Sequence, residues 1–190
     1  MDKKLITVLS ILGILVLAFF INTTMQKGYN SKEDILFSID KNDIKKIVIK
    51  SNVDAIELMQ IDTTWIISGN DTLTIKENVI NNFLDTMYEI KKKHHVTSKE
   101  KKWINYGINN EEGTHLAMIN NAGETIAYYV FGKSKDSNEY NTCYVRSNQS
   151  LDVFLLDSNI MYQLQTNPTF WGEAPTQKES QQPSPPIIIE

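Results

Sequence analysis

The feature that most constrains this chain is an uncharged apolar run near its start. Between Leu5 and Ile21, thirteen of seventeen residues are Leu, Ile, Val or Phe. As an α-helix the run is about 25 Å long at ~1.5 Å per residue, the short end of what the ~30 Å hydrocarbon core of a bilayer requires. No polar face interrupts it at helical spacing, so it does not resemble a buried core helix. We therefore expect a transmembrane anchor over residues 5–24, with the lipid bilayer as the partner of Leu5 to Ile21.

The competing interpretation of this run is a cleaved signal peptide. Such peptides end in small residues at the cleavage site, and Phe19-Phe20-Ile21-Asn22 contains no Ala-x-Ala. Bacterial lipoprotein processing requires a cysteine after the run, and the only cysteine is Cys143. We expect the anchor to stay attached to the chain.

The charges that flank the run bear on its orientation. Lys3 and Lys4 precede it, and Lys27 and Lys32 nearly balance them on the other side. The positive-inside rule weakens for long translocated domains. We expect residues 1–4 in the cytoplasm and the C-terminal domain in the periplasm, as in a single-pass protein of the bacterial inner membrane.

The rest of the chain divides by composition. Residues 25–34 form a polar tether, and residues 35–171 carry the periodic patterns of a folded domain. All five prolines fall between Pro168 and Pro186, and a Gln/Ser/Pro-rich stretch cannot bury a core. We expect residues 172–190 to form a disordered tail.

Alternation of apolar and polar residues predicts two groups of antiparallel strands. The first covers residues 44–50, 56–61 and 65–67. The second covers residues 115–119, 125–131, 140–146 and 152–156. The expected fold class is α+β: one small domain of antiparallel strands in two meanders, with two or three helices, after the transmembrane helix.

Three helices are predicted between and after these strands. Thr74 and Glu77 have capping-box spacing ahead of an apolar face that ends near Tyr88, and Lys91 to Lys93 would close this helix. Ser98 would cap a shorter helix ended by Gly107. Asp157 or Ser158 would cap a last helix that carries Ile160, Met161 and Leu164.

Composition and motifs argue against several classes of function. The net charge is −4 and no basic face carries interleaved aromatics, so nucleic-acid binding is not expected. One cysteine excludes an internal disulfide. His94 and His95 are adjacent, which does not favour joint metal ligation. No catalytic motif is present, and we expect no enzyme activity, no metal and no cofactor; an envelope hydrolase would need a carboxylate or histidine cluster assembled across the fold.

Two groups of residues are candidates for contact with a partner or with lipid. One is a basic cluster, for which a solvated surface is the simpler explanation; it includes Lys91, Lys92, Lys93, Lys101 and Lys102. The other is Phe170 and Trp171, next to the tail, which we expect to form a partner surface. Core burial is the expectation for Trp103 and Tyr106.

A series of short motifs follows the apolar run in a fixed order. They are Ile44-Lys45-Lys46-Ile47-Val48-Ile49, Trp65-Ile66-Ile67, Tyr106-Gly107-Ile108, Phe131-Gly132-Lys133, Tyr144-Val145-Arg146 and Val153-Phe154-Leu155-Leu156. In this order the chain resembles the uncharacterised bacterial family catalogued as domain of unknown function 4340. The resemblance covers residues 1–164 and implies an auxiliary envelope protein linked to ABC-type transport systems, including those near gliding-motility components.

These observations together predict a non-catalytic, membrane-anchored accessory protein of an envelope complex. The alternative is an extracytoplasmic module that binds or senses a glycan or a peptide.

Overall fold

The computed structural model describes residue 16 and residues 35–134 and 142–175. The chain divides into two compact units, Met1–Ile35 and Leu36–Glu190. Apart from Val16, the expected anchor lies outside the described residues, as do the tether and most of the expected tail. Within the described part of the chain, no helix combines the length and apolar character needed to cross a membrane.

The second unit is built on an antiparallel sheet. Its eight strands lie in the order β3-β2-β1-β6-β7-β8-β9-β5. Their bounds are β1 Lys46–Lys50, β2 Ala55–Ile61, β3 Thr64–Ile67, β5 Lys92–Thr97, β6 Thr114–Ile119, β7 Thr125–Gly132, β8 Tyr144–Ser147 and β9 Val153–Leu156. A separate two-stranded ladder joins β4, Thr74–Ile75, to β10, Gly172–Glu173.

The two predicted meanders are both present, and they join into one sheet. β1, β2 and β3 are neighbours in the sheet and follow one another in the chain, as do β6, β7, β8 and β9. The junction is the antiparallel pair of β1 and β6, in which Ile47 lies opposite Met118 and Ile49 opposite Leu116. Both meanders therefore place their apolar residues on the same face, because side chains alternate along a strand.

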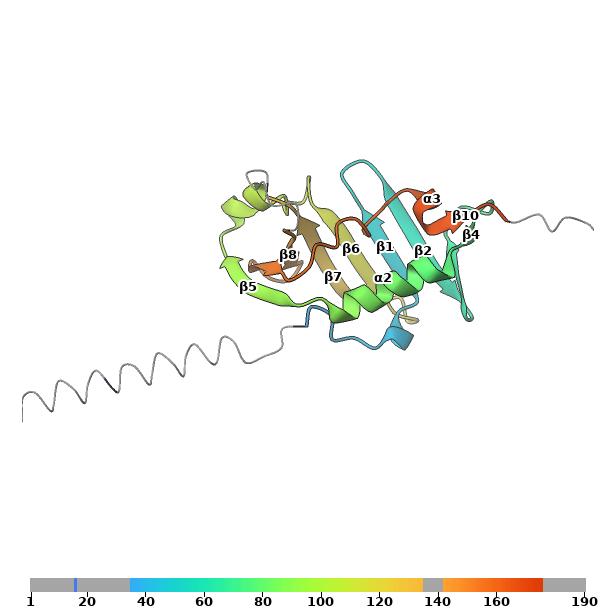
Figure 1. The fold of residues 1–190 in the computed structure, drawn as a ribbon, viewed down its shortest axis with the longest axis horizontal. Coiled ribbons are helices and arrows are strands. Elements are labelled where there is room, and N and C mark those ends of the chain that lie inside the picture. The colour runs from blue at the N-terminus through green and yellow to red at the C-terminus, as the bar shows by residue number, and fades with distance from the viewer. Residues whose placement is uncertain (1–15, 17–34, 135–141, 176–190) are drawn as a thin grey trace, which may run out of the picture. The chain divides into compact units, whose positions relative to one another are not determined.

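One face of the sheet carries the main core. The helix α2, Glu77–Glu89, crosses this face (Figure 1). Its apolar residues recur at three- and four-residue steps, and it buries Ile80, Phe83, Leu84 and Met87 against the sheet. The α+β assignment is confirmed in this form: a mostly antiparallel sheet with few helices.

Among the described residues, a second apolar cluster lies on the opposite face, against β7 and β9. There the 3₁₀ helix η2, Glu100–Tyr106, and the loop after it enclose a smaller apolar cluster. Trp103, Ile108, Val130 and Val153 are buried in it. The prediction that Trp103 belongs to a core is confirmed.

Two of the predicted helix caps are wrong. Thr74 lies in β4, opposite Glu173, so its backbone is extended and cannot cap α2; the N-cap residue is Lys76, whose side chain makes no capping bond. Ser98 does not cap η2 either, because its hydroxyl donates to the carboxylate of Asp152 at 2.6 Å. Gly107 ends η2 as predicted, at φ +60°.

The predicted helix over residues 158–164 is also wrong. The segment forms turns, in which the Asn159 side chain accepts the backbone N–H of Met161 at 3.0 Å. Ile160 and Leu164 are still buried in the main core. The last helix is instead α3, Pro168–Trp171, where Asn167 is the N-cap and Pro168 occupies the first turn.

The folded unit also continues past the boundary expected at Trp171. Gly172 and Glu173 form β10, which pairs with β4. Next to them, the backbone N–H of Lys76 donates to the carbonyl of Trp171 at 2.8 Å. The segment from Trp171 to Glu173 is therefore hydrogen-bonded to the residues just before α2.

Candidate functional site

The basic residues singled out in the sequence lie on an edge strand and on the helix after it. Lys91 and Lys93 are exposed and Lys92 is half-buried at the start of β5, an outer strand of the sheet. The ammonium of Lys92 lies 5.0 Å from the ring centre of Phe154. We expected these lysines to close α2, but α2 ends at Glu89, so their charge lies along the sheet edge. Lys101 and Lys102 are exposed on η2.

The strand β5 carries two further features of a protected edge. Its ladder with β9 shifts register twice, between Lys92 and His94 and between His95 and Thr97. Lysines and bulges of this kind discourage the pairing of an edge strand with another chain.

A small polar group lies just after the C-terminal end of β5. The hydrogen bond that Ser98 donates to the Asp152 carboxylate holds the pKa of Asp152 below its usual value. His95 lies 3.4 Å from the same carboxylate.

The chain enters the folded unit directly beside this basic edge. The backbone N–H of Leu36, the first residue of the unit, donates to the carbonyl of Ile90 at 3.0 Å. Lys91 to Lys93 follow Ile90 in the sequence. Leu36 therefore lies next to the start of the basic strand, although the two are more than fifty positions apart in the sequence.

Trp171 is not a surface residue, and the expectation that it would be exposed is wrong. Its side chain is 0% exposed. The indole packs edge-on against Phe83 at 5.3 Å and Phe170 at 5.0 Å. The indole N–H donates to the carbonyl of Gln165 at 2.7 Å. These contacts make Trp171 the link between the C-terminal segment and α2.

Phe170 stays half-buried and borders a groove beside α2. The groove has a volume of about 440 Å³ and lies between α2 and the segment after β9. Tyr162 borders it too and is 61% exposed. Gln163, at its base, has a buried side-chain oxygen with no hydrogen-bond partner. Contact of Phe170 with a partner stays a prediction.

Three of the motifs that carry the family resemblance meet at one place in the fold. A Cβ added at Gly132 would lie 2.1 Å from the carbonyl oxygen of Gly107, so the end of β7 and the end of η2 touch through their backbones. The ring of Tyr106 lies 4.8 Å from that of Tyr144. Both glycines are needed because any side chain would separate these two segments.

Arg146, the only arginine of the chain, completes this junction. It is 2% exposed, and its guanidinium lies 3.9 Å from the ring centre of Trp103. Its Nε–H donates to the carbonyl of Ile108 at 2.8 Å, and Nη2 donates to the side chain of Asn110 at 2.5 Å. Burial lowers the pKa of Arg146. The planar fork of arginine binds two acceptors and stacks on an aromatic ring at once, which lysine cannot do.

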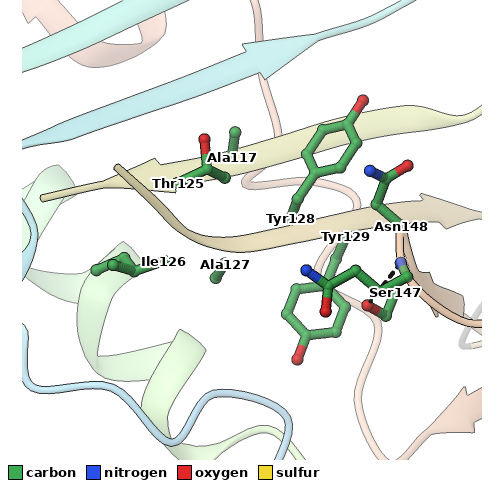
Figure 2. A pocket seen from close by; sticks show the side chains of 9 residues that line it. Ala117, Thr125, Ile126, Ala127, Tyr128, Tyr129, Ser147 and Asn148 are labelled. Atoms are coloured by element: carbon green, nitrogen blue, oxygen red, sulfur yellow. Dashed lines mark hydrogen bonds between the residues drawn. The ribbon is translucent and has the colours of Figure 1, made fainter. Parts of the chain in front are cut away.

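A cavity of about 460 Å³ lies beside the first half of β7 (Figure 2). Tyr128 and Tyr129 project from opposite faces of this strand. Their hydroxyls are engaged elsewhere: Tyr128 with His115 Nδ1 at 2.8 Å, and Tyr129 with the carbonyl of Leu36 at 2.8 Å. The turn at Ser147 to Gln149 closes one end of the cavity. No pattern in the sequence indicates this cavity, because the cavity depends on where β8 stops pairing with β7.

Cys143, the only cysteine of the chain, has a buried thiol. Burial in the main core raises the pKa of the Cys143 thiol to about 12. Among the described residues, no three His, Cys, Asp or Glu side chains are placed to hold a metal ion.

Comparison with known proteins identifies one family. The family model described as "Domain of unknown function (DUF4340)" matches residues 65–174, more than half of the chain, and it includes the three motifs that meet around Arg146. The resemblance drawn from the motifs is therefore confirmed. The comparisons with curated proteins and with solved structures found no match.

Proposed function

Because this chain belongs to the DUF4340 family, we propose that it is a non-catalytic, membrane-anchored accessory protein whose folded unit lies outside the cytoplasm. Its partner is an envelope complex of the ABC-type transport or gliding-motility class. The apolar run from Leu5 to Ile21 supports the anchor, and the motif order supports the class of partner.

The observation that carries this proposal is the position of the basic strand at the entrance to the folded unit. Leu36 is hydrogen-bonded to Ile90, and Lys91 to Lys93 come next. A tether over residues 25–34 spans at most about 35 Å when fully extended. An anchored chain would therefore hold these lysines near the membrane surface, where they meet the neighbouring subunits of a complex.

The expected contact is an acidic surface on a membrane protein. Exposed lysines add mainly to the rate and selectivity of association. This contact is sensitive to salt, because the Debye length is only about 10 Å at 0.1 M ionic strength.

Affinity purification of the full-length chain in a mild detergent, after crosslinking in cells, tests the proposal. The unaltered chain should recover transport-type membrane subunits. The triple variant Lys91→Glu, Lys92→Glu, Lys93→Glu should recover them at least fivefold less. As a control, Lys50→Glu with Lys133→Glu reverses two exposed lysines away from the strand and should behave like the unaltered chain. The double variant Lys91→Glu, Lys93→Glu makes the same change in net charge as this control and should still lose recovery.

Three results would count against the proposal. One is recovery of the bait alone from repeated crosslinked preparations. Another is equal recovery of transport subunits by the triple variant and the control. The third is binding of the lysines to anionic vesicles without any protein partner, which would assign the basic strand to lipid.

The second candidate function is a ligand-binding or sensing module for a glycan or peptide. The cavity beside β7 favours it, because the cavity is open to solvent and is bordered by two tyrosines and by the polar side chains of Thr125, Asn148 and Gln149. A small ligand that raises the melting temperature of the full-length chain would support this function.

A further inference from the structure

The strand β7 is longer than its neighbour on one side. β8 pairs with β7 only from Tyr129 to Gly132. The backbone N–H of Asn148 makes one more bond, to the carbonyl of Tyr128 at 3.0 Å, and the chain then turns away. In the described part of the chain, no strand pairs with residues 125–128 on this side.

Ile126 stands out within this half of β7. The ladder with β6 shifts register between Met118, which lies opposite Ala127, and Ile119, which lies opposite Thr125. Ile126 is thus the one residue of β7 without a Cα partner in either β6 or β8. Bulges of this kind interrupt the regular pairing of a strand and occur often beside functional sites.

The space beside these residues is the cavity of about 460 Å³ shown in Figure 2. The hydroxyls of Tyr128 and Tyr129 have partners, and Ser147 Oγ accepts the backbone N–H of Gln149 at 3.2 Å. The side chains of Thr125, Asn148 and Gln149 also border the cavity. Beside these side chains lies the backbone of β7, next to which β8 places no strand residue before Tyr129. Backbone N–H and C=O groups are best satisfied by another extended backbone.

We propose that this cavity binds a short extended peptide segment, which adds to β7 as a strand in the position that β8 leaves vacant. The segment takes its backbone hydrogen bonds from β7 between Thr125 and Tyr128, apart from the Tyr128 carbonyl, which already accepts from Asn148. The rings of Tyr128 and Tyr129, on opposite faces of β7, contact its alternating side chains. The preferred ligand therefore carries aliphatic or β-branched residues at alternate positions, the mode by which sheet edges recognise peptides.

The dimensions favour a peptide over the edge of another folded domain. Four residues of strand span about 13 Å at ~3.3 Å per residue. One end is closed by the turn at Ser147 to Gln149. Beyond Ile126, a second cavity is bordered by Asp43 and by the β6–β7 turn at Asn120 to Ala122. The stretch of β7 between these two turns therefore matches a segment of three to five residues.

Nuclear magnetic resonance of the ¹⁵N-labelled full-length chain in detergent micelles tests the proposal. The probe is the blocked pentapeptide Thr-Val-Thr-Val-Thr, titrated into the millimolar range. It should shift the amide signals of Ile126 and Tyr128 and slow their hydrogen exchange at least tenfold. The same pentapeptide with every amide N-methylated keeps the side chains but has no donors, and it should bind at least tenfold more weakly.

Two substitutions at one position separate backbone pairing from side-chain contact. Ile126→Pro removes the backbone donor and should weaken binding of the pentapeptide at least tenfold. Ile126→Val keeps the donor and should bind within twofold of the unaltered chain. If Ile126→Pro does not fold, the exchange of the Ile126 amide in the unaltered chain decides the question.

Four outcomes would overturn the proposal. The first is equal binding of the normal and N-methylated peptides. The second is the absence of any shift at Ile126 and Tyr128 at saturating or millimolar peptide. The third is protection of these amides before peptide is added, which would mean that another segment of this chain already pairs with β7 there. The fourth is protection that depends on protein concentration, which would mean that a second copy does so. None of these outcomes bears on recovery of transport subunits, so the two proposals fail separately.

Discussion

Replacing Trp171 with alanine should be among the most destabilising changes in this protein. The side chain is fully buried and packs edge-on against Phe83 and Phe170. Truncation of a buried tryptophan to alanine typically costs about 3–5 kcal/mol. The carbonyl of Gln165 also loses its donor, and leaving such a group unpaired costs roughly 1–3 kcal/mol. Because these terms overlap, we expect a loss of about 5 kcal/mol in the free energy of unfolding.

The matched variants are Trp171→Phe and Phe170→Ala. Trp171→Phe keeps most of the buried area but removes the indole N–H, so it should cost about 1–3 kcal/mol. Phe170→Ala changes a half-buried ring and should cost about 1 kcal/mol. Urea denaturation of the full-length chain in detergent, followed by far-ultraviolet circular dichroism, measures all three. A larger loss for Phe170→Ala than for Trp171→Ala would refute the assignment of Trp171 to the core.

Two further predictions concern the junction of the motifs and the buried thiol. Gly132→Ala should lower the free energy of unfolding by about 3 kcal/mol through overpacking against Gly107. The control Gly123→Ala meets only open space, at φ +81°, and should lower it by about 1 kcal/mol. Equal losses for the two variants in denaturant titrations would contradict the backbone contact. Burial raises the pKa of Cys143 to about 12, so the unfolded thiol ionises first, and stability should fall as the pH rises from about 9 towards 12. Cys143→Ala should reduce that slope in denaturation measured at pH 8, 9.5 and 11, and an unchanged slope would show that the thiol does not cause it.

The sequence predicted the strands well wherever one face of the sheet is buried. In β1, Ile47 and Ile49 point into the core and Lys46 and Lys50 do not, so the alternation is visible in the residue types. The strand β5 has no such signal, because Lys92 to His95 are all polar and only the ladder with β9 makes them a strand. Its assignment depends on a partner about sixty residues away, which local propensity does not register.

The errors near the C-terminus have the same origin. Ile160 and Leu164 are spaced as on a helix and are buried as on a helix, but the Asn159 side chain bonds the backbone of Met161 and starts a turn instead. Trp171 follows the first of the prolines and precedes the expected tail, so it looks exposed in the sequence. The structure buries it because β10 returns to pair with β4.

The candidate surfaces could be predicted only in part. Residue type alone identified Lys91 to Lys93 and Phe170. The position of the lysines beside the start of the folded unit depends on the tertiary contact of Leu36 with Ile90, which the sequence does not reveal. The cavity beside β7 follows from the unequal lengths of β7 and β8 and from the bulge at Ile126. Neither leaves a pattern in the composition or the spacing of residues.

The most direct test of the anchored accessory protein is to fractionate its own cells and to determine which fraction holds the mature chain and at which residue that chain begins. Membranes washed with alkaline carbonate should retain the full-length chain with residues 1–24 still attached, as mass spectrometry of the purified protein would show. Protease added outside spheroplasts should then digest the folded unit. A soluble mature protein that begins after Ile21 would contradict the anchor and make the chain a secreted factor.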